Sequence, residues 1–239
     1  NAGIDQCQGA DMLAELATTD PAAHAKVLEA AKALENTEAL LWKVEKAGAP
    51  ASYLFGTMHL SDSRITTLSP KVREALGQSD TIVLEGGDLS QEALIAAMAT
   101  SGADLVYADG RTLSEQLTAE EFKKVETVVA ASGMPGEFAR ILKPWLVGTL
   151  LSVSDCERRN VASGAKVLDM QIAEEAKTRG LPVSGLETIN QQLTALSGVP
   201  EEQQIQMLRV SLKFADRTAD MMETITQMYL SRRMGAAMP

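Results

Sequence analysis

Three short apolar runs, separated by longer amphipathic segments, constrain most strongly what this chain can fold into. The runs cover residues 52–57, 81–85 and 182–186. Runs of this length that are bounded by turn residues are typical of buried strands. In the longer segments between them, apolar residues recur at spacings of three and four, which predicts helices. The alternation predicts an α/β or α+β fold with a partly parallel sheet.

The other expected elements are arranged around these three strands. Residues 40–46 and 52–57 flank a Gly- and Pro-containing turn and predict a hairpin. Two short helices are expected near the N-terminus, and residues 200–233 predict one long helix with Ile205, Leu208 and Leu212 on one seam. The remaining helices are expected at 69–78, 90–100, 118–132, 136–153 and 165–179, with another after residue 187. A length of 239 residues favours a single domain over residues 1–239.

Composition excludes several classes of protein. The chain has 22 basic and 32 acidic residues, a net charge of −10, which argues against a nucleic-acid partner. No apolar run reaches the roughly 18 to 20 residues of a membrane span, so no stable membrane insertion is expected. The two histidines and two cysteines exclude a three-histidine or four-cysteine zinc site. Cys7 and Cys156 are compatible with one disulfide or with two buried thiols.

Each predicted strand ends in a side chain that can do chemistry. His59 follows the first strand, Glu85 closes the second, and Glu187 follows the third. Gly56 allows a tight backbone and Thr57 offers a hydroxyl beside the histidine. Because ligands bind at the carboxyl ends of parallel strands, the imidazole and the two carboxylates predict a cluster. Such a cluster could hold Mn²⁺ or Zn²⁺, or act as a metal-free acid and base.

Each of these residues also has a structural interpretation. A lone histidine after a strand is often a satisfied structural residue, and a glutamate at a strand end is often an acid in the first turn of the next helix. Lys143-Pro144-Trp145 interrupts an apolar helix, as a kink with an aromatic plug or as a cation and an indole that line a pocket. A Cys156–His59 dyad is a further alternative, and it needs a reduced thiol.

A series of motifs, taken in order over residues 40–195, resembles one known family. It begins with Leu41-Trp42-Lys43-Val44 and a strand that ends in Gly56-x-x-His59. It continues through Ile82-Val83-Leu84-Glu85, Lys143-Pro144-Trp145, Gly164-x-x-x-x-Asp169, and Gly185-Leu186-Glu187-Thr188 with Gln191 or Gln192. In this order the motifs are similar to those of the TraB/GumN family, relatives of the Tiki proteins that cleave Wnt.

The resemblance implies a fold, an activity and a set of site residues. The fold would be a Tiki-like mixed sheet flanked by helices, related to those of ChaN and erythromycin esterase. The activity would be that of a peptidase dependent on a divalent metal such as Mn, Co or Zn. His59 and Glu85 would bind the ion, and Glu187 would be a further ligand or the base. The residues expected to bind substrate are Gly56, Thr57, Lys143, Trp145 and Gln191.

The family resemblance also bears on location and completeness. Cys7-Gln8-Gly9 is similar to the start of mature exported bacterial members, which predicts a periplasmic or secreted protein, a removed signal peptide and a Cys7–Cys156 disulfide. Family members usually carry a second Gly-x-x-His near the C-terminus, which this sequence lacks. The domain is therefore expected to be incomplete at its C-terminus.

Three hypotheses about function follow from these residues. The first is a metal-dependent hydrolase acting on peptides or another small substrate. The second is a non-catalytic binding protein on the same fold, with a ligand such as haem or a peptide held near Trp145 and Tyr53. The third is an assembly module that forms a homodimer through its helices.

Overall fold

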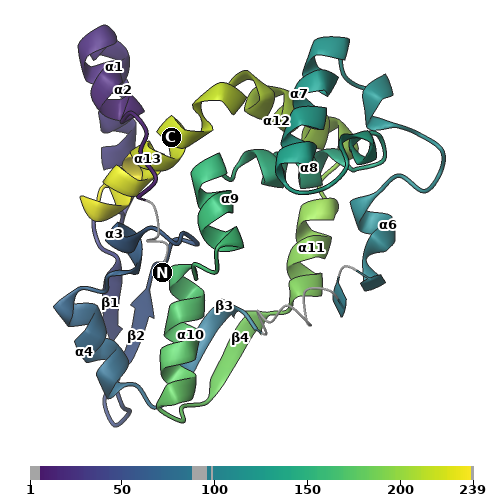
Figure 1. Cartoon of the computed structure of the whole chain (residues 1–239). Coiled ribbons are helices and arrows are strands. Elements are labelled where there is room, and N and C mark those ends of the chain that lie inside the picture. The colour runs from purple at the N-terminus through teal and green to yellow at the C-terminus, as the bar shows by residue number, and fades with distance from the viewer. Residues whose placement is uncertain (1–5, 88–95, 98, 238–239) are drawn as a thin grey trace. The chain divides into compact units, whose positions relative to one another are not determined.

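A computed structural model describes residues 6–87, 96–97 and 99–237 of the chain (Figure 1). These residues form two compact units that interleave in sequence. Unit 1 comprises Asn1–Ile82, Arg159–Pro182 and Ala219–Pro239, and unit 2 comprises Val83–Arg158 and Val183–Thr218. Helices flank small sheets, so the chain is a mixed α/β protein, as the sequence predicted.

Unit 1 contains the predicted hairpin. Strands β1 (Leu41–Val44) and β2 (Ser52–Phe55) pair antiparallel, with Leu41 opposite Phe55. The helices of this unit are α1 (Met12–Thr19), α2 (Pro21–Lys32), α3 (Ser63–Thr66), α4 (Pro70–Gln78), α10 (Leu168–Thr178) and α13 (Thr218–Leu230). Side chains cap the starts of α1, α2, α3 and α4. At α2, the Asp20 carboxylate accepts from the backbone N–H of Ala23 at 2.9 Å, and Pro21 occupies the first turn. The predicted N-terminal helical segment is thereby confirmed.

Unit 2 contains the other pair of strands. Strand β3 (Ile82–Gly86) pairs with β4 (Val183–Glu187). The hydrogen bonds that flank this pair join Ile82 N–H to the Pro182 carbonyl and Gly87 N–H to the Glu187 carbonyl. The residue numbers of the partners increase together along both strands, so the strands run parallel. The helices are α6 (Gly102–Leu105), α7 (Ala119–Ala131), α8 (Pro144–Leu151), α11 (Ile189–Ser197) and α12 (Glu201–Lys213). Helix α9 (Asp155–Ala162) begins in unit 2 and ends in unit 1.

Each unit has its own apolar core. In unit 1, Leu13 of α1, Met228 of α13 and Ala236 of the 3-10 turn at Met234–Ala237 form one buried cluster, with Val27 and Ala31 of α2 packed against it. In unit 2, α7, α8 and α12 meet around fully buried side chains that include Leu113, Val125, Val129 and Val147. Within the described residues, the strands form two separate pairs, one in each sheet.

Two predicted helices were wrong in extent. The long helix expected over 200–233 is interrupted after Lys213, where Phe214 has φ −106° and ψ 6° and a 3-10 turn follows at Ala215–Arg217. The helix expected over 136–153 is a 3-10 turn at Gly136–Arg140 followed by α8, because Pro144 starts a new helix. Helix α9 was not predicted, and the helix expected at 90–100 lies largely outside the described residues.

Both cysteines are disulfide-bonded, and since the chain has two, Cys7 is joined to Cys156. This confirms the predicted disulfide.

In the part of the chain that the structure describes, no helix has the length and apolar character needed to cross a membrane.

Candidate functional site

His59 lies just beyond β2, in unit 1, where the chain leaves the hairpin. The last ladder bond joins the Gly56 N–H to the Leu40 carbonyl at 2.8 Å. The Gly56 carbonyl in turn accepts a hydrogen bond from the Tyr229 hydroxyl of α13 at 2.8 Å. The backbone is thus fixed three residues before the histidine. Its side chain is 58% exposed.

Asp169 is the residue that orients this histidine. It occupies the second position of α10, and its side chain is 6% exposed. One carboxylate oxygen lies 2.7 Å from His59 Nδ1, and the other accepts from the Thr57 hydroxyl at 2.7 Å. The neighbouring Leu168 N–H donates to the Leu60 carbonyl at 3.2 Å, which anchors the start of α10 to the same segment.

The electrostatics of this pair favour an ionised carboxylate. Burial would raise the pKa of Asp169, but the hydrogen bonds from His59 and Thr57 outweigh it, and the pKa lies below its ordinary value. Burial, together with the nearby Asp169 charge, raises the pKa of Tyr229 to about 12. The tyrosine is therefore a neutral hydrogen-bond donor at physiological pH.

This arrangement has a definite chemical consequence for the imidazole. An ionised Asp169 accepts a hydrogen bond from Nδ1–H, so the proton of the neutral ring stays on Nδ1 and the lone pair is on Nε2. A carboxylate behind a histidine is found both where the ring accepts protons in catalysis and where it ligates a metal. The geometry prepares His59 for either role.

The two predicted acids lie in unit 2, on neighbouring strands. Glu85 is exposed in β3 and accepts a hydrogen bond from the Gln192 side-chain amide at 3.2 Å. Glu187 is the exposed last residue of β4. Because β3 and β4 run parallel, both acids belong to the carboxyl-terminal end of this pair. His59 belongs to unit 1.

Three further predicted residues have structural contacts in unit 2. Gln191 closes a capping box at the start of α11, where its side chain accepts from Thr188 N–H at 2.8 Å. Trp145 is buried at the start of α8, and its indole N–H donates to the Asp104 carbonyl at 2.9 Å. Lys143 caps the same helix through its backbone, and Pro144 begins the helix, so the predicted kink inside a helix was wrong.

Asp169 and Tyr229 belong to the candidate site, and the sequence did not reveal either of them as such. Asp169 was visible as the end of Gly164-x-x-x-x-Asp169, without an assigned role. Tyr229 carried no signal, because it is 173 positions from Gly56 and sits in an ordinary amphipathic helix.

The described residues contain no group of three or more His, Cys, Asp or Glu side chains arranged to hold a metal ion. His59 and Asp169 have the chemistry of one metal ligand and its orienting carboxylate, and a complete donor set would need further residues.

Comparison with protein families identifies the class to which the chain belongs. The model of the TraB/PrgY/gumN family matches residues 40–238, which is most of the chain, and the protein is therefore a member of this family. Searches of curated proteins and of solved structures found no match. The matched region includes Gly56, Thr57, His59, Asp169 and Tyr229.

Proposed function

We propose that the protein is a hydrolase that acts on peptides and that His59 is its central catalytic residue. The observation that supports this proposal is the Asp169–His59 pair. A buried carboxylate holds Nδ1 of a histidine whose ring is more than half exposed. This combination orients the ring without burying it.

The proton chemistry follows from the tautomer. His59 Nε2 accepts a proton from a water molecule as its oxygen attacks the peptide carbonyl. The resulting imidazolium, stabilised by Asp169, then returns the proton to the leaving amine as the C–N bond breaks. General acid–base catalysis of this kind contributes about 10²- to 10⁴-fold in rate.

The second form of the proposal assigns Nε2 to a divalent ion such as Mn, Co or Zn. Such an ion would polarise the carbonyl and acidify a bound water. His59 would be one ligand, with the Asp169 carboxylate orienting the ring through Nδ1. Because Nε2 cannot serve as both base and ligand, an experiment can separate the two forms.

The experiment compares the wild type with His59→Ala, Asp169→Asn and the control His24→Ala, which removes the chain's other histidine. Hydrolysis of a mixed peptide pool is followed by mass spectrometry, with EDTA or with added Mn²⁺, Co²⁺ or Zn²⁺. Loss of turnover in His59→Ala and Asp169→Asn, with His24→Ala unchanged, is expected. Inhibition by EDTA together with bound metal assigns the ligand role, and insensitivity to EDTA assigns the base role.

A His59→Ala variant that hydrolyses peptides as fast as the wild type would overturn the proposal. If the wild type binds peptides or haemin without hydrolysing any peptide, the non-catalytic binding protein is the correct interpretation. A Soret shift on haemin titration that is lost in His59→Ala would identify the haem version.

We further propose a periplasmic or secreted location. Disulfides persist in oxidising compartments, and Cys7–Cys156 supports this assignment. Fractionation of cells that express the full-length gene tests the location, and recovery of the protein in the cytosol with free thiols would contradict it.

A further inference from the structure

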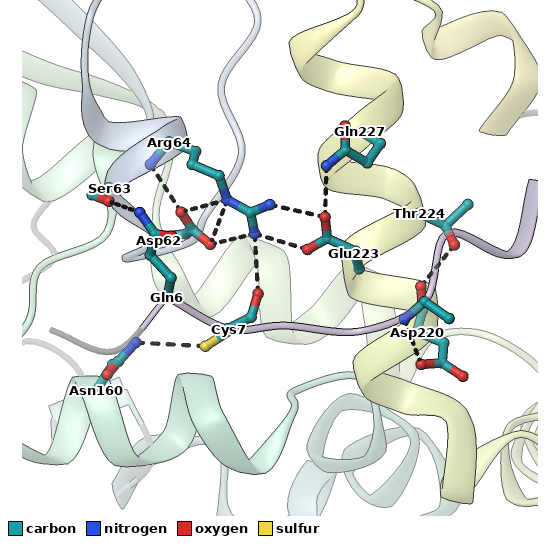
Figure 2. A network of polar contacts seen from close by, with 11 residues as sticks. Gln6, Cys7, Asp62, Ser63, Arg64, Asn160, Asp220, Glu223, Thr224 and Gln227 are labelled. Carbon is teal, nitrogen blue, oxygen red and sulfur yellow. Dashed lines mark hydrogen bonds and ion pairs between the residues drawn. The ribbon is translucent and has the colours of Figure 1, made fainter. Parts of the chain in front are cut away.

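Arg64 is the centre of a partly buried polar network in unit 1 (Figure 2). Its guanidinium binds Glu223 through two parallel hydrogen bonds of 2.8 Å and Asp62 through Nη2 at 2.7 Å and Nε at 3.1 Å. Nη2 also donates to the Cys7 carbonyl at 3.0 Å. Both carboxylates are largely removed from solvent, with side chains 3% and 10% exposed. A single cation therefore joins three segments that are far apart in sequence.

The first of these segments is the N-terminal one, residues 6–12, which lies outside the residues matched by the family. It runs along α13, where Asp220 accepts from the Ala10 N–H and Thr224 accepts from the Met12 N–H, both at 2.8 Å. A Cβ atom on Gly9 would lie 2.3 Å from the Ala219 carbonyl oxygen, so this backbone is seated directly against the helix. Figure 2 shows the segment passing between Arg64 and Asp220.

The second segment, residues 56–64, carries His59. Helix α13 holds it at both ends: Tyr229 binds the Gly56 carbonyl, and Glu223 binds Arg64. Glu223 and Tyr229 are six positions apart on α13, which is about 9 Å along the helix axis. Within residues 56–64, the Asp62 carboxylate accepts a hydrogen bond from the Arg64 backbone N–H at 2.8 Å and caps α3. The backbone around His59 is therefore fixed by α13 on one side of the histidine and by the Arg64 network on the other.

We propose that Arg64 is a positioning residue for His59, because it couples the N-terminal segment and α13 to the segment that carries the histidine. The role in catalysis rests on the proposed function, whereas the coupling itself can be measured without substrate. Residues 6–12 then help to fix the position of His59, although the family match begins at residue 40.

The chain contains a matched control for this arginine in unit 2. Arg111 also follows an aspartate by two residues, binds that Asp109 at 2.8 Å, and pairs with Glu201 through hydrogen bonds of 2.9 and 3.0 Å. Its side chain is 54% exposed, against 26% for Arg64. The two arginines have the same local chemistry and differ in burial and in connection to His59.

Hydrogen exchange followed by mass spectrometry, with the disulfide reduced after quenching, tests the coupling in Arg64→Lys and Arg111→Lys. Lysine is a point donor and cannot replace the planar fork that serves two carboxylates and a carbonyl. We expect exchange in residues 6–12 and in 56–64 to rise together by about tenfold in Arg64→Lys and to stay unchanged in Arg111→Lys. Where hydrolysis is measurable, kcat should fall about 10- to 100-fold with KM unchanged.

Two further variants keep the test decisive. Tyr229→Phe removes only the bond to Gly56, and it should raise exchange near that residue without loosening residues 6–12. Glu223→Gln keeps an oxygen acceptor for Arg64 and replaces Arg64→Lys if that variant does not fold. Faster exchange confined to residues 6–12 would overturn the proposal and make Arg64 an N-terminal anchor alone. A wild type that hydrolyses nothing, with both segments coupled, would refute the proposed function and leave the coupling intact.

Discussion

The Asp169 carboxylate serves two donors at once, and this double contact explains why it can be both buried and ionised. A buried carboxylate is stable when hydrogen bonds to its charged form offset the loss of hydration. Thr57 and His59 approach separate oxygens, each at 2.7 Å. Replacing Thr57 by valine should therefore weaken the hold on His59 less than Asp169→Asn does, since it removes one donor and keeps the charge.

Glu223 and Asp62 both contribute to the pH dependence of the Arg64 network, because Arg64 holds the pKa of each carboxyl below its ordinary value. Hydrogen bonds from Arg64 lower the pKa of the Glu223 carboxyl, and burial raises it by less. A carboxyl whose folded pKa is depressed stabilises the protein above its unfolded pKa, about 4.3, and loses that contribution as the pH falls through the folded value. We expect Glu223→Gln to lower the free energy of unfolding by about 1 to 3 kcal/mol at neutral pH, with the difference from wild type shrinking below about pH 4.

Guanidinium unfolding followed by tryptophan fluorescence at a series of pH values measures this difference. The control is Glu29→Gln, whose carboxylate is 78% exposed in an ion pair with Lys32 and should contribute little at any pH. A difference that grows in acid would show that the sign is wrong.

The sequence located His59 but not its partner, and the reason is distance along the chain. Gly56-x-x-His59 directly follows an apolar strand, so position and chemistry are visible within eight residues. Asp169 is 110 positions away, inside a helix whose acidic first turn is common in any protein. Only the packing of α10 against the His59 segment distinguishes it from other helix acids.

Element boundaries followed local chemistry where a cap or a proline was present. Pro70 and Thr118 marked the starts of α4 and α7 correctly. Proline is favoured in the first turn of a helix, and threonine is favoured as the N-cap residue. The break at Phe214 has no such mark, since residues on both sides keep an apolar helical spacing. The chain leaves unit 2 and enters unit 1 just after this break, so tertiary structure decides it.

The close approach of β3 and β4 depends on Gly185. A Cβ atom there would lie 2.2 Å from both the backbone nitrogen and the Cα of Gly87. We expect Gly185→Ala to separate the strands and to destabilise the protein by more than about 2 kcal/mol. Gly148→Ala on α8 is the control, because its Cβ meets nothing within 4 Å and should stabilise the helix by about 0.5 to 1 kcal/mol. Thermal unfolding of the two variants measures both effects, and equal stability of Gly185→Ala and wild type would contradict the close approach.

At the scale of the whole molecule, the chain crosses between its units repeatedly, and residues brought together in one unit come from three separate stretches. Unit 1 joins its N-terminal, middle and C-terminal stretches, as the bonds from Arg64 to Glu223 and from His59 to Asp169 illustrate. Bringing together residues this distant in sequence costs chain entropy before their contacts contribute any stability. In such a topology, a covalent link that closes a long loop stabilises the fold by reducing the entropy of the unfolded chain.

The Cys7–Cys156 disulfide closes a loop of about 150 residues, for which the chain-entropy model gives a stabilisation of about 5 kcal/mol. We expect the double variant Cys7→Ser, Cys156→Ser to lose stability of that order, since the unfolded chain gains the freedom that the bond removes. Intact mass after alkylation without reductant should equal the unmodified mass in the wild type and rise by two adducts after reduction. Denaturant unfolding of the wild type with and without a dithiol provides a second measure. Equal unfolding midpoints for the oxidised, reduced and double-variant proteins would contradict a stabilising role for the disulfide.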